Sequence, residues 1–236
     1  MADGGKVFVG LDVLKSADEK NLNKFLNDNG IKATAGPVAE TDDNYYYQTP
    51  YFLLPTVKDT KATTDVVGDL QVFIPLSAGL SKLKTDGVRF TTLMSTTDKA
   101  IAKNSLTDSD SIQNAISDTN TIKKESGDEQ GKFALGLIAK NSNKGVVAAF
   151  GSVYTFTDQM NQQISGRNAT LFSDVFAYLL PSDSGTSVSI PSKSIDATTL
   201  AINASSIRIF GLLFGIFLPL ALIVYGIVVC IVRKRR

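Results

Sequence analysis

Two short stretches of this chain combine residue types that could do chemistry. Asp108 and Asp110 lie two positions apart in a polar region, a spacing that hints at calcium ligands. The full D-x-D-x-D-G pattern of a calcium loop is absent, so the sequence favours a solvated loop. Gly151-Ser152 follows an apolar segment, and open α/β sheets bind ligands where their strands end. Because every strand must end in a turn, this second signal is weak.

The chain contains no histidine, and its single cysteine is Cys230. These absences exclude Ser-His-Asp and Cys-His catalysis, histidine general bases, and zinc sites built on imidazole or thiolate ligands. Carboxylates, lysines and tyrosines remain, but we expect neither an enzyme nor a bound cofactor or metal. A G-x-x-x-x-G-K-[ST] loop is also absent, so the chain is not itself an ATPase.

Residues 40–55 form the segment richest in aromatic side chains, ETDDNYYYQTPYFLLP. Tyrosines with polar neighbours can form a recognition surface, because they combine a large apolar ring with a hydroxyl group. A competing interpretation packs this loop onto the sheet. The candidate partner-binding residues of this segment are Tyr45, Tyr46, Tyr47, Gln48, Tyr51 and Phe52.

The patterns around these residues predict an α/β fold. Lys6–Gly10 and Ile31–Val38 read as strands on either side of a helix from Ser16 to Asn29, with Ser16 as its N-cap. Gly30 ends this helix. The resulting β-α-β unit favours a parallel sheet with helices on the outside.

Further elements follow from apolar periodicity. We expect strands at Gln71–Pro75, Val88–Ser95, Lys132–Lys140 and Gly145–Phe150, and helices at Leu76–Lys84, Ser111–Ser117 and Asn168–Leu180. The short turn Asn141–Lys144 makes the last two strands antiparallel neighbours. The predicted fold is therefore a mostly parallel sheet flanked by helices, with an antiparallel strand pair near its end.

A long apolar segment near the C-terminus predicts one transmembrane helix. Ile209 to Val232 is 24 residues without a charge. At about 1.5 Å per residue it would extend roughly 36 Å, enough to cross a hydrocarbon core of about 30 Å. Pro219 lies within it, where we expect a kink rather than a break.

The charges around this segment predict its orientation. Arg208 precedes it, whereas Arg233, Lys234, Arg235 and Arg236 follow it directly. Because positive charge is retained on the cytoplasmic side, we expect a single-pass cell-membrane protein with a cytoplasmic C-terminus and with residues 1–207 extracytoplasmic. The basic tail would then act as a membrane anchor that also contacts anionic lipid.

Four parts are predicted along the chain. They are an extracytoplasmic α/β domain at 1–180, a linker and juxtamembrane helix at 181–207, a transmembrane helix at 208–232 and a cytoplasmic basic tail at 233–236. Removing the five basic residues from position 208 onward leaves 19 Lys and Arg against 23 Asp and Glu, a net charge of −4 for residues 1–207. This acidic balance argues against nucleic-acid binding.

The N-terminus conflicts with export of the predicted outer domain. Met1–Gly10 has no basic region followed by an apolar region, as an export signal requires. Either upstream residues that carried a first span are missing, or the chain is tail-anchored with its domain in the cytosol. The basic tail favours the first alternative, in which the domain is incomplete at its N-terminus.

Several segments of the chain resemble one protein family. They are NLNKFLNDNGIKATAGPVAETDDNYYYQTPYFLLP, GDEQGKFALGLIAK, GVVAAFGSVYTFTD, GRNATLFSDVFAYLL and SVSIPSKSIDATTL, followed by the apolar segment and the basic tail. Together they are similar to the auxiliary component of gliding-motility-type ABC transporters. The resemblance covers nearly the whole chain in the right order, but its motifs are structural and almost silent on mechanism.

The resemblance implies an outer region similar to the class I glutamine amidotransferase fold without its catalysis. It also implies an upstream half and an N-terminal span that this sequence does not contain. The matching positions add Ser152, Asp158 and Arg167 to the candidate partner-binding residues, although turn and cap chemistry would also explain them.

From the resemblance we expect a non-catalytic, membrane-anchored auxiliary subunit of an ABC transporter. Its outer domain would contact the cargo or the permease, and a permease and its ATPase would be its partners. The alternative is an extracytoplasmic glycan- or peptide-binding protein, anchored by a single span, that uses the tyrosine-rich segment as its platform.

Overall fold

The computed structural model of the 236-residue chain describes residues 4–14, 19–66, 72–117, 122–163, 167–180, 219–220, 225 and 233–234. The chain divides into two compact units, Met1–Thr186 and Ser187–Arg236. The fold and the candidate sites below belong to the first unit.

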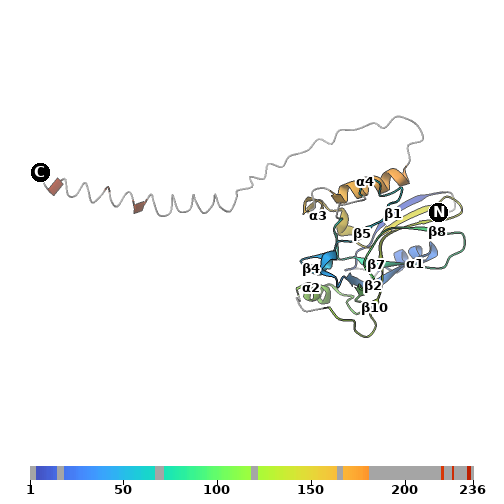
Figure 1. Ribbon diagram of the computed structural model, residues 1–236, viewed down its shortest axis with the longest axis horizontal. Helices are drawn as coiled ribbons and strands as arrows, with labels where there is room; N and C mark the ends of the chain where they lie inside the picture. Colours follow the sequence, from blue (N-terminus) through green and yellow to red (C-terminus); the bar gives the residue numbers. More distant parts are fainter. Residues whose placement is uncertain are drawn as a thin grey trace, which may run out of the picture. The chain divides into compact units, whose positions relative to one another are not determined.

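A nine-stranded mixed sheet forms the centre of the described part of this unit (Figure 1). Its main path runs β1 (Lys6–Gly10), β12 (Val146–Phe150), β11 (Ala134–Lys140), β7 (Ala78–Lys82), β2 (Ile31–Ala39), β9 (Ile101–Ala102) and β10 (Glu129–Gln130). Off this path, β8 (Arg89–Ser95) pairs with β11 and with β5 (Thr56–Val57). A smaller sheet contains β3 (Tyr46–Tyr47), β4 (Thr49–Leu53) and β6 (Ile74–Pro75).

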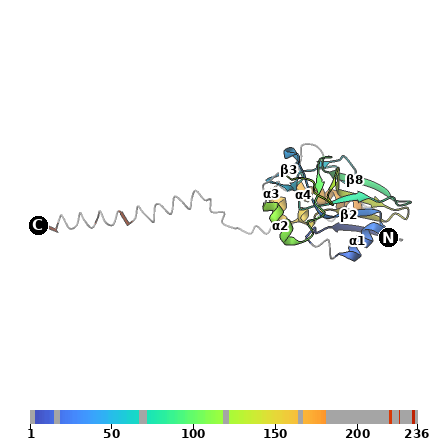
Figure 2. The ribbon, with the colours of Figure 1, turned by 90° about the horizontal axis from the view of Figure 1, so that it is seen from below.

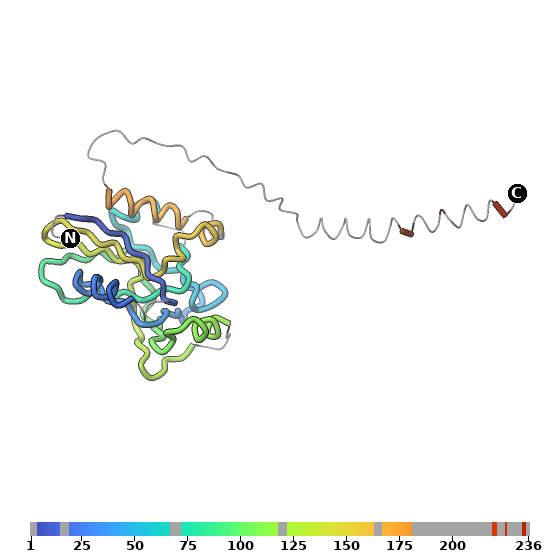
Figure 3. The backbone as a smooth tube through the Cα atoms, turned by 180° about the vertical axis from the view of Figure 1, so that it is seen from behind, coloured from blue at the N-terminus to red at the C-terminus, as the bar shows by residue number. Residues whose placement is uncertain are grey.

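Helices cover both faces of the central sheet. Helix α4 (Arg167–Leu179) packs Leu171, Val175 and Leu179 into one apolar cluster with Phe150. Helix α1 (Lys20–Asp28) packs Leu26 into a second cluster. Figure 3 shows α4 and α1 on opposite sides of the strands. Successive side chains of a strand point to opposite faces of the sheet, so the strands contribute residues to both clusters. This is the arrangement of a sheet that is buried on two faces.

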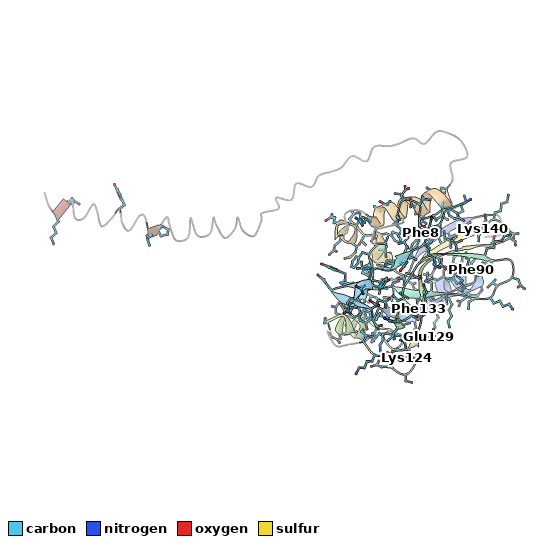
Figure 4. All side chains as sticks on the ribbon, in the orientation of Figure 1. Phe8, Phe90, Lys124, Glu129, Phe133 and Lys140 are labelled. Atoms are coloured by element: carbon cyan, nitrogen blue, oxygen red, sulfur yellow. The ribbon has the colours of Figure 1, made fainter. Side chains whose placement is uncertain are left out.

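Phe8 of β1 joins the central sheet to α4. Its ring centroid lies 5.3 Å from Phe150, 5.6 Å from Phe172 and 5.3 Å from Phe176. Figure 4 shows Phe8 beneath α4. Aromatic rings at such distances stabilise the packing beyond the area that they bury.

The predicted mostly parallel, amidotransferase-like sheet is wrong. Among the described strands, β1 and β12 form the one parallel pair, and every other pair is antiparallel. The strand, helix and strand of the predicted β-α-β unit are present, but the second strand does not run parallel to the first. Three strands separate β1 from β2, and the successive pairings make β2 run opposite to β1.

The helix predicted at Leu76–Lys84 is also wrong, because this segment forms strand β7. The spacing of its apolar residues fits the period of a helix and also that of a strand. The segment lies between β2 and β11, however, and pairs with each of them. Gly79 fits this crowded position, since a Cβ there would lie 2.7 Å from the ring of Phe133. Pairing with distant strands therefore overrides the local helical pattern.

Several other elements confirm the prediction from periodicity. Lys6–Gly10 is β1, β8 covers the strand expected at Val88–Ser95, and α4 covers the helix expected at Asn168–Leu180. Strands β11 and β12 are antiparallel neighbours as expected. Helix α1 begins at Lys20, and its predicted N-cap, Ser16, lies outside the described residues.

The predicted C-terminal transmembrane helix, and the single-pass membrane localisation inferred from it, require correction. In the part of the chain that the structure describes, no helix combines the length and the apolar character needed to cross a membrane. Most of the predicted span, 208–232, lies outside the described residues, as do Arg235 and Arg236 of the predicted anchor.

Candidate functional site

The tyrosine-rich segment folds into a small hairpin. A 3-10 turn, η1 (Asp43–Tyr45), leads into β3, and β4 returns antiparallel to it. Gln48 connects the two strands with a φ of 61°, a left-handed conformation that few residues other than glycine adopt. We call the hairpin and the preceding turn, residues 43–53, the aromatic hairpin.

The tyrosines of the aromatic hairpin differ in exposure. Tyr51 is 1% exposed and belongs to the core, whereas Tyr45 is 36% and Tyr47 is 49% exposed. Phe52 is half-buried. The structure therefore places Tyr51 in the core, whereas a recognition surface at Tyr45 and Tyr47 stays a prediction. Tyr51 packs the hairpin onto the domain, and Tyr45 and Tyr47 present their rings to solvent.

Side-chain contacts hold Tyr46 and Tyr47 in place. The Tyr46 hydroxyl donates to Asp43 Oδ1 at 2.7 Å, and this hydrogen bond, aided by burial, raises the pKa of Tyr46. Gln48 Nε2 donates to the Tyr47 hydroxyl at 3.3 Å. The ring of Tyr47 meets Phe73 edge to face at 6.3 Å. Rings fixed in this way lose less entropy on binding than mobile side chains do.

Two carboxylates brace the chain before the aromatic hairpin. Glu40 is 1% exposed and accepts hydrogen bonds from the Thr97 N–H at 3.0 Å and the Thr97 hydroxyl at 2.8 Å. Asp42 accepts from the Asn44 N–H, which lowers the pKa of Asp42, and forms an ion pair with Lys99 at 3.3 Å. These contacts tie the hairpin to the segment that follows β8.

The turn after β12 is closed to ligands. Ser152 is fully buried, and its hydroxyl donates to the carbonyl of Pro75. A Cβ at Gly151 would lie 2.0 Å from the carbonyl oxygen of Ala78, so backbone fills the space beside this residue. A nucleophile or ligand therefore has no room at the strand end that the sequence singled out.

Asp158 and Arg167 lie beyond this turn. Asp158 is exposed at the start of α3 (Asp158–Gln163) and lines a small cavity of about 230 Å³ with Phe156, Asn168 and Phe172. Arg167 begins α4 and is half-buried. The structure thus separates Ser152 from solvent and leaves Asp158 at the surface.

Buried charged groups of the described residues make contacts within the domain. Lys103 Nζ lies 2.6 Å from Asp128 Oδ2 and 2.7 Å from Glu125 Oε2. Burial lowers the pKa of Lys103, but its hydrogen bonds to these two carboxylates outweigh burial and leave the pKa raised. Asp174 accepts from the Asp65 N–H at 2.8 Å, and burial raises the pKa of its carboxyl group.

Asp108 caps the helix that follows it. Its Oδ1 accepts from the Ser111 N–H at 2.8 Å and its Oδ2 from the Ser111 hydroxyl at 2.7 Å, at the start of α2 (Ser109–Ser117). These hydrogen bonds lower the pKa of Asp108. Across the described ranges, no group of three potential metal-ligating side chains comes together.

The structure also contains a polar groove that sequence reasoning missed. A cavity of about 480 Å³ lies beside β2, with walls contributed by α1, β2, the segment after β9 and β10. We call it the β2 groove. Its lining includes Asn23, Asn27, Lys32, Ala33, Asn104 and Glu129. These residues come from segments far apart in the chain, so no local motif indicates the groove.

Comparison with known proteins gives one kind of match. No family model matches the chain, and no curated protein does. Among solved structures, the N-terminal domain of mmIFT52 is similar, with a TM-score of 0.50 and 20% identity over 78% of this chain and 69% of that one. At this identity the likeness concerns the fold alone.

Proposed function

We propose that this chain is a non-catalytic, protein-binding auxiliary subunit of an ABC transporter. The exposed tyrosines of the aromatic hairpin carry the proposal. Tyr45 and Tyr47 flank Tyr46 in the sequence and are both exposed. Gln48 and Phe73 contact Tyr47, and Asp43 holds the hydroxyl of Tyr46. Tyrosine anchors of this kind contribute most of the binding energy at many protein interfaces.

The chemistry of the domain supports a binding role over catalysis. The sequence has no histidine, and the buried carboxylates Glu40, Asp128 and Asp174 make hydrogen bonds within the domain. The buried hydroxyl of Ser152 bonds to backbone. An enzyme would need a titratable or nucleophilic group directed at an accessible reacting atom.

The transporter role rests on the sequence resemblance to gliding-motility-type auxiliary components. In this role the aromatic hairpin contacts the permease or the cargo, and a permease and its ATPase are the partners. A glycan- or peptide-binding protein is the second candidate, because exposed tyrosines also suit those ligands. The two functions differ in what the chain should retain during purification.

Co-purification of the full chain from its native cells tests the proposal. We expect an ABC permease and its ATPase to be recovered with the unaltered chain. Changing both Tyr45 and Tyr47 to alanine should weaken this association by on the order of 2 kcal/mol if both are anchors. The thermal melt should change much less than it does for a core substitution, because 36% of Tyr45 and 49% of Tyr47 is exposed.

Two control variants separate binding from folding. Leu180→Ala removes another exposed apolar side chain and should leave recovery of the partners unchanged. Tyr51→Ala should lower stability by about 3 kcal/mol, because it empties a core position. The proposal fails if no permease or ATPase is recovered, or if the Tyr45 and Tyr47 double variant retains full binding with a native melt.

A further inference from the structure

Strand β2 has one side that is only partly paired. On this side β9 pairs with Val38 and Ala39, and the Lys103 N–H donates to the Pro37 carbonyl. The Ala35 N–H also points to this side, where Asn104 Oδ1 accepts it at 3.2 Å. Within the described ranges, no strand lies beside the first half of β2 here.

The register identifies which groups of this first half face outward. Ala33 is opposite Leu80 of β7, and the flanking Gly30 carbonyl accepts from the Leu83 N–H. The N–H and C=O groups of successive residues alternate between the two sides of an antiparallel strand. Those of Lys32 therefore point toward β7, and those of Ala33 point away from it. The N–H and C=O of Ala33 therefore face the same side as the Ala35 N–H and the Pro37 carbonyl.

The β2 groove lies along this outward-facing edge. Its volume, about 480 Å³, is within the range of pockets that bind ligands. The walls carry the amides of Asn23, Asn27 and Asn104, with one positive group, Lys32, and one negative group, Glu129. Figure 2 shows α1 beside β2, and Figure 4 shows Glu129 on the part of the domain that holds β10.

We propose that the β2 groove binds an extended polypeptide segment of a partner protein, which adds to the sheet as a strand beside Ile31–Ala35. The added strand would continue the edge position that β9 already occupies at Val38 and Ala39. Its main chain would bond to the N–H and C=O of Ala33, and main-chain pairing supplies the affinity in this mode of recognition.

The lining also indicates the side chains of the bound segment. Amide groups both donate and accept hydrogen bonds, and the single lysine and glutamate offset each other in charge. The bound segment is therefore uncharged and polar, rich in serine, threonine and asparagine. This site shares no residue with the aromatic hairpin and goes beyond the function proposed above.

Amide hydrogen exchange on the full chain tests the open edge. The Ala33 N–H should exchange quickly, while the neighbouring Lys32 N–H, which faces β7, should be protected. Slow exchange at Ala33 in the free chain would show that another segment already covers the edge, which overturns the proposal.

Selection from a phage-displayed library of random dodecapeptides tests the binding. Selected peptides should be rich in uncharged polar residues and should slow exchange of the Ala33 N–H when added to the unaltered chain. Ala33→Pro should weaken their binding at least tenfold, because it removes the outward N–H and obstructs the edge.

A matched control exists on another partly paired edge, that of β8. Strand β8 pairs with β5 at Met94 and Ser95, and the Leu93 carbonyl accepts from the Lys58 N–H on that side. Thr92 lies opposite Leu137, whose main-chain groups face β12, so the Thr92 N–H points away from β11. Thr92→Pro therefore removes an outward-facing N–H away from the β2 groove. Peptide binding should survive this change.

Three results would overturn the proposal. They are a library that yields no binder, binders whose affinity is unaffected by Ala33→Pro, and binders that are lost with Tyr47→Ala instead. If Ala33→Pro fails to fold, the exchange measurement on the unaltered chain decides: unchanged exchange at Ala33 with saturating peptide rejects the site.

Discussion

Asn168 binds the main chain of Phe73 through both ends of its amide side chain. Its Oδ1 accepts from the Phe73 N–H at 3.1 Å, and its Nδ2 donates to the Phe73 carbonyl at 2.8 Å. The same Nδ2 donates to the Thr155 carbonyl at 2.8 Å. Asn168 is 1% exposed. Its amide therefore satisfies, in the interior, the N–H and C=O of Phe73 that a neighbouring strand would otherwise bond. Helix α4 is thereby joined to the residue that supports the ring of Tyr47.

Asn168→Ala should lower the free energy of unfolding by about 3 kcal/mol, because buried backbone groups of Phe73 and Thr155 lose their partners. Asn168→Asp should be at least as harmful, since a carboxylate cannot donate to the two carbonyls. Asn161→Ala is the control. This change removes a single hydrogen bond, which Asn161 accepts from the Ala169 N–H and which is more exposed to solvent. It should cost about 1 kcal/mol or less. Urea denaturation measures all three, and equal losses at 161 and 168 would contradict this role.

The buried pair of Lys103 and Asp128 gives a second prediction. Asp128→Ala leaves the ammonium group of Lys103 buried without its closest partner, and should cost about 3 to 5 kcal/mol. Glu125→Ala should cost much less, because the Glu125 side chain is 67% exposed. The double variant Lys103→Met, Asp128→Leu should be more stable than Asp128→Ala alone. Urea denaturation of these variants checks this order.

A third prediction concerns pH and the cap of α2. Hydrogen bonds from Ser111 lower the pKa of Asp108 below its ordinary value of 3.8. An acid whose pKa is lower in the folded state stabilises the fold above its unfolded pKa, and this contribution is lost as the pH falls through the folded value. Asp108→Ala should therefore lower the melting temperature at neutral pH. The difference should shrink as the pH drops below about 3.8.

Asp98→Ala provides the control for the cap, since Asp98 is an exposed carboxylate in the turn after β8. Its melting temperature should follow that of the unaltered chain at every pH. A difference between Asp108→Ala and the unaltered chain that stays constant down to the lowest pH would contradict the assigned cap.

The sequence alone located most of the elements. The strand at Lys6–Gly10, the hairpin of β11 and β12 and the helix α4 depend on local signals, namely apolar periodicity and short turns. The absence of histidine is likewise a fact of the sequence, and it excludes whole classes of catalysis before any coordinates are known. Local patterns suffice for such conclusions because they concern residues close together in the chain.

Only the tertiary structure decided how these elements pair and which side chains reach solvent. The direction of β2, the strand character of Ala78–Lys82 and the parallel contact of β1 with β12 depend on partners far away in the chain. The same holds for the buried Tyr51 beside the exposed Tyr47, and for the β2 groove. The physical reason is that strand pairing and burial are set by which distant surfaces exclude water together, and no short stretch of sequence records that choice.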